Sequence, residues 1–171
     1  MNLLELATYP DPCLRIRTRA VGEFTGELEN TIRGMTEIMY LNKGIGLAAT
    51  QVGLGSSLFI ADVGEGLKVF VNPEIIERSD EKDRMEEGCL SLAGVGVNVA
   101  RPENVKIKAR DIHGEFFFET FDGLMAKVVQ HEMDHLEGKL IIDYLNPALR
   151  FWNAWKLARQ KRSLETQRMR A

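Results

Sequence analysis

Two of the three histidines in this chain lie four residues apart with a glutamate between them, in the segment His131-Glu132-Met133-Asp134-His135. On a helix, residues four apart share a face, so both imidazoles can reach a single metal ion. The carboxylate of Glu132 would then lie close enough to take a proton from a metal-bound water. The segment predicts a hydrolytic metal site, and the alternative is an exposed amphipathic helix with a run of polar residues.

Two histidines leave such a site one protein ligand short, because catalytic zinc-type sites use three ligands and keep a fourth position for water. In metzincin proteases a third histidine follows the motif, but Ile141 occupies that position here. Glu165 is the only acidic residue after Asp143, and it lies among basic residues. Cys89, which follows Gly88 between predicted strands, is the better candidate, although a lone cysteine is often a small buried side chain.

One thiolate and two imidazoles would leave a tetrahedral position for a water whose pKa the metal lowers. Glu132 would take the proton of that water and return it to the leaving nitrogen. The attacked carbonyl oxygen becomes negative and needs hydrogen-bond donors. The backbone N–H of Leu90 and the side-chain amide of Gln51 are the candidate donors.

The elements that must position these residues predict an α+β domain. Apolar residues at helical spacing predict a helix over 27–42, and the small residues of 44–49 allow a close approach of the backbone. Five segments are predicted to be short strands. Two of them alternate apolar with small or polar residues, at 95–99 and 105–109, and the last returns from a hairpin turn at 111–114. The five segments lie at 58–62, 68–71, 95–99, 105–109 and 115–121, with Asn72-Pro73 ending the second and a charged loop over 79–87.

Two further helices are predicted after the strands. Asp122 can cap a helix that runs to Gly138. One stripe of this helix carries Leu124, Val128, His131 and His135. Asn146-Pro147 can begin a last helix, because proline suits the first helical position. We expect Phe151, Trp152, Trp155 and Ala158 on the inner side of that helix.

Composition and charge suit one globular domain with a basic tail. The chain has 171 residues, 44% of them hydrophobic, and a net charge of −3. Segment 147–171 holds seven basic residues and one acid, so it carries +6 and leaves −9 for the rest. Such a tail is either a docking element or a solvated helix face. Two cysteines, no recognisable targeting segment and no long apolar run lead us to expect a cytoplasmic protein without a membrane span.

Three blocks of the sequence resemble the bacterial-type peptide deformylase family. They are the segments 44–53, 87–91 and 130–138, which contain GIGLAATQVG, EGCLS and QHEMDHLEG, and Tyr9-Pro10-Asp11-Pro12 adds to them. Their order and separations also match the family, so the similarity covers nearly the whole chain. It implies one catalytic domain over 1–171, in which antiparallel or mixed β-sheets surround a central metal-binding helix and a basic C-terminal helix spans 147–171.

The resemblance implies that the chain removes the formyl group from N-formylmethionine on nascent polypeptides and releases formate. Cys89, His131 and His135 would bind one divalent metal ion, and Glu132 would act as general acid and base. The family's usual metal is ferrous iron, with zinc, nickel or cobalt found in preparations. Gln51 and the amide of Leu90 would hold the formyl oxygen.

The resemblance also implies how a substrate would bind. Its backbone would pair with Ile45, Gly46 and Gly88. Its methionine side chain would enter a pocket near Ile45, Leu124, Val128 and His131. Glu87 would pair with an arginine of the next strand, for which Arg101 is the candidate. The basic helix would dock on the ribosome, and no membrane or DNA partner is expected.

The residues alone leave two other functions open. One is an HExxH metallopeptidase, against which the small size and Ile141 argue. The other is a non-enzymatic module with a structural metal site, which would have no use for Glu132. Thr50 and the segment 93–97 depart from the usual family pattern and leave the shape of the binding rim open.

Overall fold

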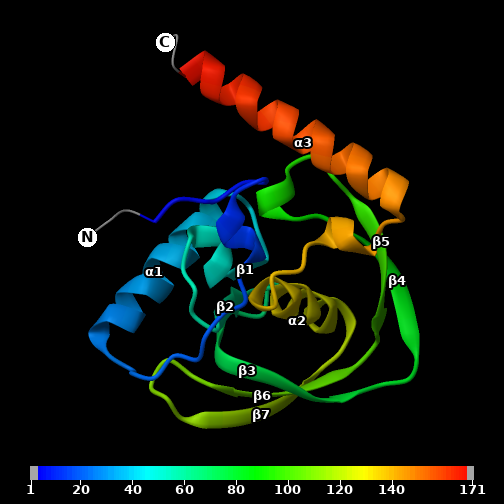
Figure 1. Ribbon diagram of the computed structural model, residues 1–171. Coiled ribbons are helices and arrows are strands. Elements are labelled where there is room, and N and C mark those ends of the chain that lie inside the picture. Colours follow the sequence, from blue (N-terminus) through cyan, green and yellow to red (C-terminus); the bar gives the residue numbers. More distant parts are fainter. Residues whose placement is uncertain (1–3, 169–171) are drawn as a thin grey trace.

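The predicted metal-binding helix lies inside a shell of β-strands (Figure 1). The structure, a computed structural model, describes residues 4–168, without the side chains of positions 164, 165, 167 and 168. The central helix α2 spans Gly123–Leu136. The strands are β1 (Gly46–Ala48), β2 (Leu58–Ala61), β3 (Lys68–Arg78), β4 (Lys82–Glu87), β5 (Val97–Pro102), β6 (Val105–Arg110) and β7 (Phe116–Phe121). They form a five-stranded sheet in the order β1-β2-β3-β6-β7 and a two-stranded sheet β4-β5. All these pairings are antiparallel, and the predicted α+β class is confirmed.

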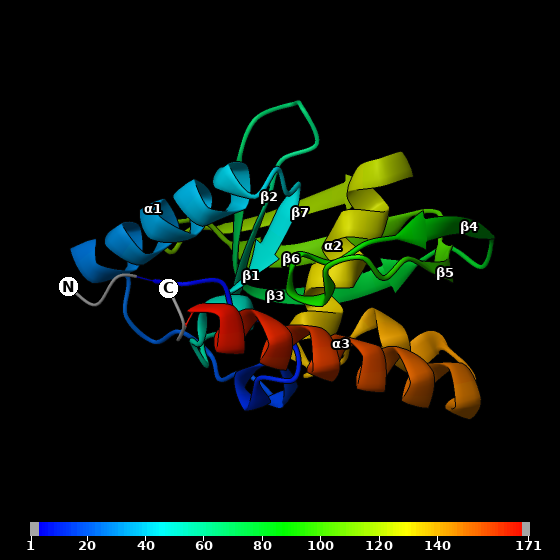
Figure 2. The same ribbon diagram turned by 90° about the horizontal axis from the view of Figure 1, so that it is seen from above.

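Helix α1 (Gly26–Leu41) covers the end of the large sheet that carries β1 and β2 (Figure 2). The predicted helical spacing is confirmed, because Leu28, Ile32, Met35 and Met39 are buried on one face of α1. Short 3-10 helices at Pro12–Arg15, Ala49–Val52, Leu90–Leu92 and Ile141–Tyr144 connect the other elements. Within residues 4–168 no helix has both the length and the apolar character that a membrane span requires.

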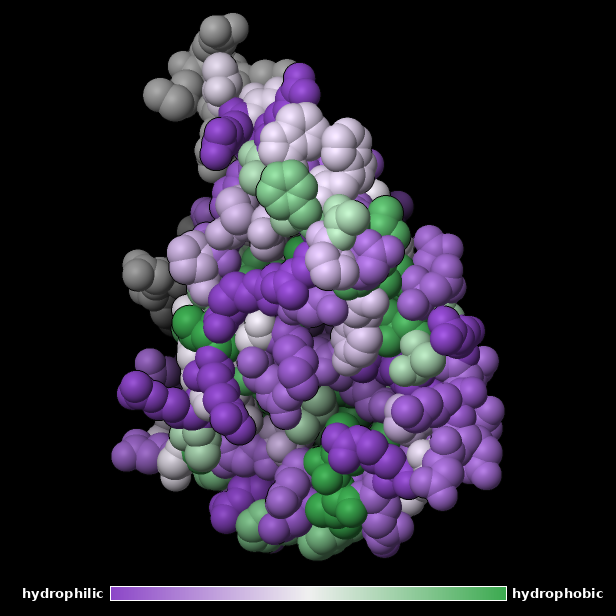
Figure 3. All heavy atoms as spheres, turned by 45° about the vertical axis from the view of Figure 1, so that its right-hand side comes forward, coloured by the Kyte–Doolittle hydropathy of each residue, from purple (hydrophilic) through white to green (hydrophobic). Residues whose placement is uncertain are grey.

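Helix α3 (Pro147–Arg168) packs on the outside of the molecule. The prediction of which side of this helix packs inward is wrong. Phe151, Trp152 and Trp155 are 73%, 59% and 46% exposed. The face that packs inward carries Ala154 and the buried Leu157, in contact with the cluster of residues 92–99 and 140–142. Both faces hold apolar residues at helical spacing, so the pattern alone could not tell them apart. Figure 3 shows pale and green side chains beside purple ones in the upper part of the molecule, where α3 lies.

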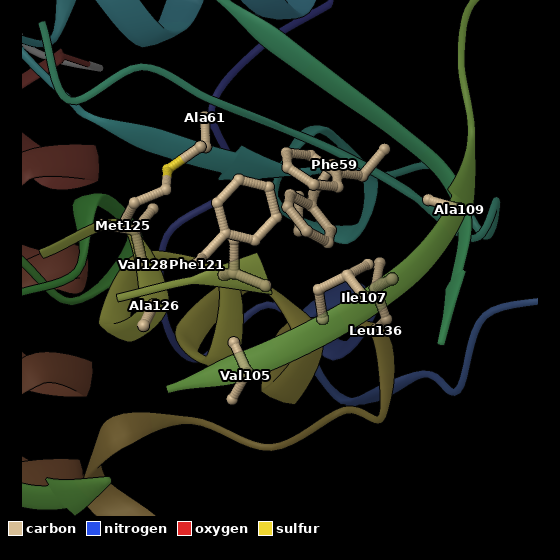
Figure 4. Packing of buried hydrophobic residues seen from close by; sticks show 13 residues of the cluster. Phe59, Ala61, Val105, Ile107, Ala109, Phe121, Met125, Ala126, Val128 and Leu136 are labelled. Carbon is tan, nitrogen blue, oxygen red and sulfur yellow. The ribbon is translucent and has the colours of Figure 1, made fainter. Parts of the chain in front are cut away.

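The main core fills the space between α2 and the large sheet (Figure 4). Phe59 of β2 and Phe70 of β3 are fully buried, and their rings stack with centroids 4.4 Å apart. The ring of Phe121 meets Phe70 edge-on at 5.6 Å. Ala126 of α2 is fully buried against this cluster, where its small side chain allows the helix to approach the sheet. The aromatic core therefore fixes the distance of α2 from the strands.

Strand β3 does not end at Asn72-Pro73, as the sequence predicts. The pairing of β3 with β6 shifts its register between Val71 and Glu74, so the proline falls at an irregularity where no ladder hydrogen bond is needed. Asn72 adopts a φ of 51°. Its side chain accepts a hydrogen bond from the backbone N–H of Val21 at 2.7 Å and donates one to the carbonyl of Val21 at 2.8 Å.

The predicted charged loop over 79–87 is largely a strand. Strand β4 pairs residue by residue with β5, from Lys82 opposite Pro102 to Glu87 opposite Val97. Its side chains are mostly exposed, so it lacks the apolar alternation that marks a half-buried strand. The alternating apolar residues lie on β5 instead, and β4 forms because its partner is fixed.

We expect Phe70→Ala to lower the free energy of unfolding by about 3 to 5 kcal/mol, because it opens a cavity in the aromatic core. Chemical denaturation followed by fluorescence or circular dichroism measures this loss. Phe118→Ala on β7 is the matched control, since Phe118 is 61% exposed. Equal losses for the two variants would contradict the assignment of this core.

Candidate metal centre

Three side chains from two separate segments converge beside α2. Cys89 lies two residues after the end of β4, whereas His131 and His135 lie one turn apart on α2. The Sγ atom of Cys89 lies 3.3 Å from Nε2 of His135. One donor atom from each of the three residues lies within 4.8 Å of the other two, and this is the one such group found among residues 4–168. The structure therefore brings together the three ligands that the sequence suggests.

His131 is oriented by a buried ion pair behind it. Its Nδ1 atom lies 2.8 Å from Oε2 of Glu87, which directs Nε2 toward the other two ligands. Glu87 in turn accepts hydrogen bonds from Nε and Nη2 of Arg101 at 2.5 and 2.9 Å. A carboxylate behind a ligating histidine fixes its tautomer and raises its basicity. The Glu87–Arg101 pair implied by the resemblance is thus present.

The surroundings of the two histidines favour different protonation states. Burial, with the charges of His131 and Arg101, lowers the pKa of His135 well below its usual value, so this imidazole is neutral as a metal ligand must be. Burial also acts to lower the pKa of His131. Hydrogen bonds with Cys89 and Glu87 and the charge of Glu132 outweigh it and raise the pKa to about 10. Positive charge is therefore favoured at His131, beside the carboxylate of Glu87.

Glu132 lies beside the ligands with one oxygen unsatisfied. Its side chain is almost fully buried, and Oε2 has no hydrogen-bond partner among the residues that the structure describes. Burial raises the pKa of Glu132 to about 7. A carboxyl group that titrates near neutral pH can both accept and donate a proton, as general acid–base catalysis requires.

Two glycines of the small-residue segment 44–49 let the backbone pass close to the site. A Cβ atom on Gly46 would collide with Oε1 of Glu132 and would lie 2.9 Å from Cγ1 of Val128. A Cβ atom on Gly44 would lie 2.6 Å from Cδ1 of Leu90. The close approach expected from this segment therefore occurs at the proposed general base.

The two expected oxyanion donors lie next to Cys89. The Nε2 atom of Gln51 donates to Oγ of Ser91 at 3.1 Å and lies 3.5 Å from Sγ of Cys89. Its Oε1 atom accepts from the backbone N–H of Ala48 at 2.9 Å, which holds the amide in one orientation. Leu90 begins the 3-10 helix after Cys89 and lines the same cleft.

A cleft of about 750 Å³ opens onto this group. Its walls come from β1, from β4 and the loop that follows it, and from α2. Its lining includes the proposed substrate residues Ile45, Gly46, Gly88, Leu124 and Val128, together with Gln51, Cys89, Leu90, His131 and Glu132. His135 lies behind them and is 1% exposed. An extended peptide could therefore lie between β1 and the Gly88 segment and reach the ligands.

The residues present fit a divalent metal ion. Thiolate and imidazole donors suit transition metals such as zinc and iron. Glu132, next to His131 in the chain, has a buried carboxylate oxygen without a partner among the described residues, and such an oxygen calls for a ligand or a catalytic role.

Sequence reasoning missed two polar residues that extend the network around Arg101. Oδ2 of Asp134 lies 2.9 Å from Nη1 of Arg101. The hydroxyl of Tyr144 donates to the same Oδ2 atom at 2.7 Å. Asp134 stands inside the histidine motif, which could have drawn attention to it, whereas nothing in the sequence marks Tyr144. Lys127 lines the cleft but is buried, and its Nζ atom is paired with Asp83 of β4 at 2.8 Å.

Comparisons with known proteins identify the family of the chain. The family described as polypeptide deformylase matches residues 3–151. A peptide deformylase of Thermotoga neapolitana is 44% identical over 148 residues, which cover 86% of this chain and 90% of the relative. Peptide deformylase 1 of Shewanella oneidensis is 47% identical over 153 residues, covering 88% and 90%.

Solved structures give the same result. A crystal structure of a peptide deformylase from Legionella pneumophila is similar with a TM-score of 0.89 at 37% identity, covering 95% of this chain and 98% of that one. A peptide deformylase from Synechococcus elongatus in complex with actinonin has a TM-score of 0.85 at 38% identity, covering 91% and 86%. Sequence and fold agree, and the chain belongs to the polypeptide deformylase family.

Proposed function

We propose that this chain hydrolyses the formyl amide of N-formylmethionyl nascent peptides, releasing formate and a free amino terminus, as one catalytic domain over 1–171. The observation that carries this proposal is the place of Glu132, next to a thiolate–imidazole ligand group at the base of an open cleft. Membership of the deformylase family supports the same reaction.

Cys89, His131 and His135 are the proposed ligands of one divalent metal ion. We infer ferrous iron, and zinc, nickel and cobalt are ions that the same donors accept. When bound, the ion supplies Lewis-acid chemistry, which activates water and polarises a carbonyl. Metal analysis of protein purified without oxygen tests this inference.

Glu132 is the proposed proton carrier. It accepts a proton from the attacking water and gives a proton to the amide nitrogen as the bond to the formyl carbon breaks. The net reaction adds one water across one amide bond. Its raised pKa suits both steps, and Gly46 leaves the room that its carboxylate occupies.

The proposed donors to the formyl oxygen are the side-chain amide of Gln51 and the backbone N–H of Leu90. The hydrogen bond between Ala48 and Oε1 of Gln51 turns the NH₂ group toward Cys89, where a carbonyl oxygen would develop charge. A fixed donor stabilises that charge without having to reorganise during the reaction.

The substrate backbone is proposed to add to β1. Strand β1 is an edge of the large sheet, so one side of it is free to pair with an extended peptide next to Ile45 and Gly46. Gly88 flanks the cleft from the opposite side. Leu124 and Val128 of α2 line the cleft between them and form the proposed methionine pocket.

Neither alternative function draws comparable support. The third histidine of a metzincin-type peptidase is absent, and Ile141 is buried in a separate 3-10 helix. A structural metal site has no need of an open cleft or of a buried carboxylate beside its ligands.

Helix α3 is proposed to dock on the ribosome, which would place the enzyme in the cytoplasm next to emerging formylated chains. Lys156, Arg159 and Arg162 are exposed on α3, and negatively charged RNA would attract them. Trp155, which packs under the guanidinium of Arg159 with 5.4 Å between Cζ and the ring centroid, adds an exposed aromatic surface. The side chain of Arg168 and all of Arg170, which contribute to the predicted basic tail, lie outside the described part of the chain.

Glu132→Gln should lower the rate of formate release by about 10²- to 10⁴-fold and leave the metal content unchanged, because it removes the proton carrier and no ligand. Formate release and metal content measured on the same sample test this. Cys89→Ala is the comparison, and it should lose both. Activity of the wild-type enzyme on an acetylated methionyl peptide or on casein equal to that on the formylated peptide would favour a peptidase instead.

In the metal-free protein, the stability that Glu132 contributes should be lost as the pH rises from about 4.5 to about 7, because folding raises the pKa of Glu132 and so favours its protonated form. Glu132→Gln removes this contribution. Between pH 5 and pH 8, the free energy of unfolding of the variant relative to the wild type should therefore increase by on the order of 3 kcal/mol, as urea unfolding at both pH values measures. A constant difference between the two proteins at both pH values would refute the raised pKa.

Reversing the charges of Lys156, Arg159 and Arg162 to glutamate should weaken ribosome binding about tenfold or more and reduce its dependence on salt. Hydrolysis of a free formyl-peptide should stay unchanged, since these residues lie away from the cleft. The same reversal at the exposed Arg17, Arg19 and Arg33 is the control, because it changes net charge equally. Cosedimentation at several salt concentrations measures binding, and an equal loss in both triple variants would argue against specific docking.

A further inference from the structure

The polar network behind His131 continues past Arg101 to the surface. Nη1 of Arg101 lies 2.9 Å from Oδ2 of Asp134 on α2. The same Oδ2 atom accepts a hydrogen bond of 2.7 Å from the hydroxyl of Tyr144, which lies in the 3-10 helix Ile141–Tyr144. The guanidinium of Arg101 also lies over the ring of Tyr144, with 5.3 Å between Cζ and the ring centroid. A continuous chain of contacts thus links Tyr144 to His131 through Asp134, Arg101 and Glu87.

The centre of the network from Tyr144 to His131 is buried, so the loss of a contact there deprives a buried polar group of a partner. The side chains of Arg101 and Glu87 are only 5% and 4% exposed, so the arginine depends on protein groups to satisfy its charge and donors. The planar guanidinium of Arg101 contacts two carboxylates. Its Nε and Nη2 atoms face Glu87, and its Nη1 atom faces Asp134. If Asp134 did not hold Nη1, the guanidinium could turn and Glu87 would lose its bidentate partner.

We propose that Asp134 and Tyr144 are positioning residues for the metal centre, acting through Arg101 and Glu87 on the imidazole of His131. Asp134 fixes the guanidinium from the side opposite Glu87, and Tyr144 fixes the carboxylate of Asp134. The fixed guanidinium keeps Glu87 on Nδ1 of His131, so that Nε2 faces Cys89 and His135. This inference rests on the proposed ligand set.

Tyr144 contributes to the network mainly through its hydroxyl group and less through burial of its ring. Tyr144 is 47% exposed and lies at the rim of a second hollow of about 590 Å³, which Arg101 and Asp134 also line. A group this exposed contributes little packing, whereas its hydrogen bond to Asp134 is directed at a charged acceptor. Removing the hydroxyl alone therefore tests the proposal without opening a cavity.

Tyr144→Phe should weaken binding of Zn²⁺ or Co²⁺ about threefold to tenfold, at or below the lower end of the range for groups that orient metal ligands directly. Competition with a chelator measures this affinity. Tyr40→Phe is the matched control, because Tyr40 is 49% exposed and its hydroxyl donates to Asp62 at 2.5 Å, away from the metal ligands. Both variants should unfold at similar temperatures in the metal-free state, and only Tyr144→Phe should lower metal affinity.

A double-mutant cycle tests the path. In a Glu87→Gln background, Tyr144→Phe should have little further effect on metal affinity, because the network no longer has its carboxylate link to His131. Wild-type affinity in Tyr144→Phe, or an undiminished effect in the Glu87→Gln background, would overturn the proposal. Wild-type metal affinity in Cys89→Ala would instead refute the ligand set itself, so the two failures can be told apart.

Discussion

Burial of polar groups on one helix is the constraint on which this structure depends. Nine of the fourteen residues of α2 are buried, and Lys127, Gln130, Glu132 and His135 are among them. Lys127 and Gln130 find partners in Asp83 of β4 and the carbonyl of Pro102 in β5. Glu132 and His135 each keep one buried atom without a partner among the described residues. The polar groups left unsatisfied are thus the two that belong to the proposed reaction site.

The site was predictable where chemistry and local spacing coincide. The histidine pair is visible because a helix places residues four apart on one face, and Cys89 follows from the chemistry of an incomplete ligand set. Arg101 came only from the family resemblance, because its role depends on strand pairing. Tyr144 could not be found, since its contact with Asp134 exists only after a 3-10 helix folds back beside α2.

The fold was predictable where the hydrophobic period is strong. Helix α1 and strand β6 lie close to their predicted positions because their apolar residues recur at the period of the element, and β2 and β7 also lie close to theirs. Strand β4 lacks such a period and depends on β5, and β3 passes Pro73 by an irregularity that no local rule predicts. On α3, the exposed tryptophans have the same helical spacing as residues that pack in a core. Spacing shows which residues share a face, but not which face is covered.

The shortness of β1 has a consequence for which chains the enzyme can serve. An edge of three residues, Gly46–Ala48, offers a visiting peptide only a few main-chain hydrogen bonds, and these are the same whatever its side chains are. If substrates pair with β1 as proposed, selectivity comes almost entirely from the first residue and its formyl cap. With the proposed binding mode, a catalyst built on so brief an edge would be a generalist that acts on chains of unrelated sequence at one shared end.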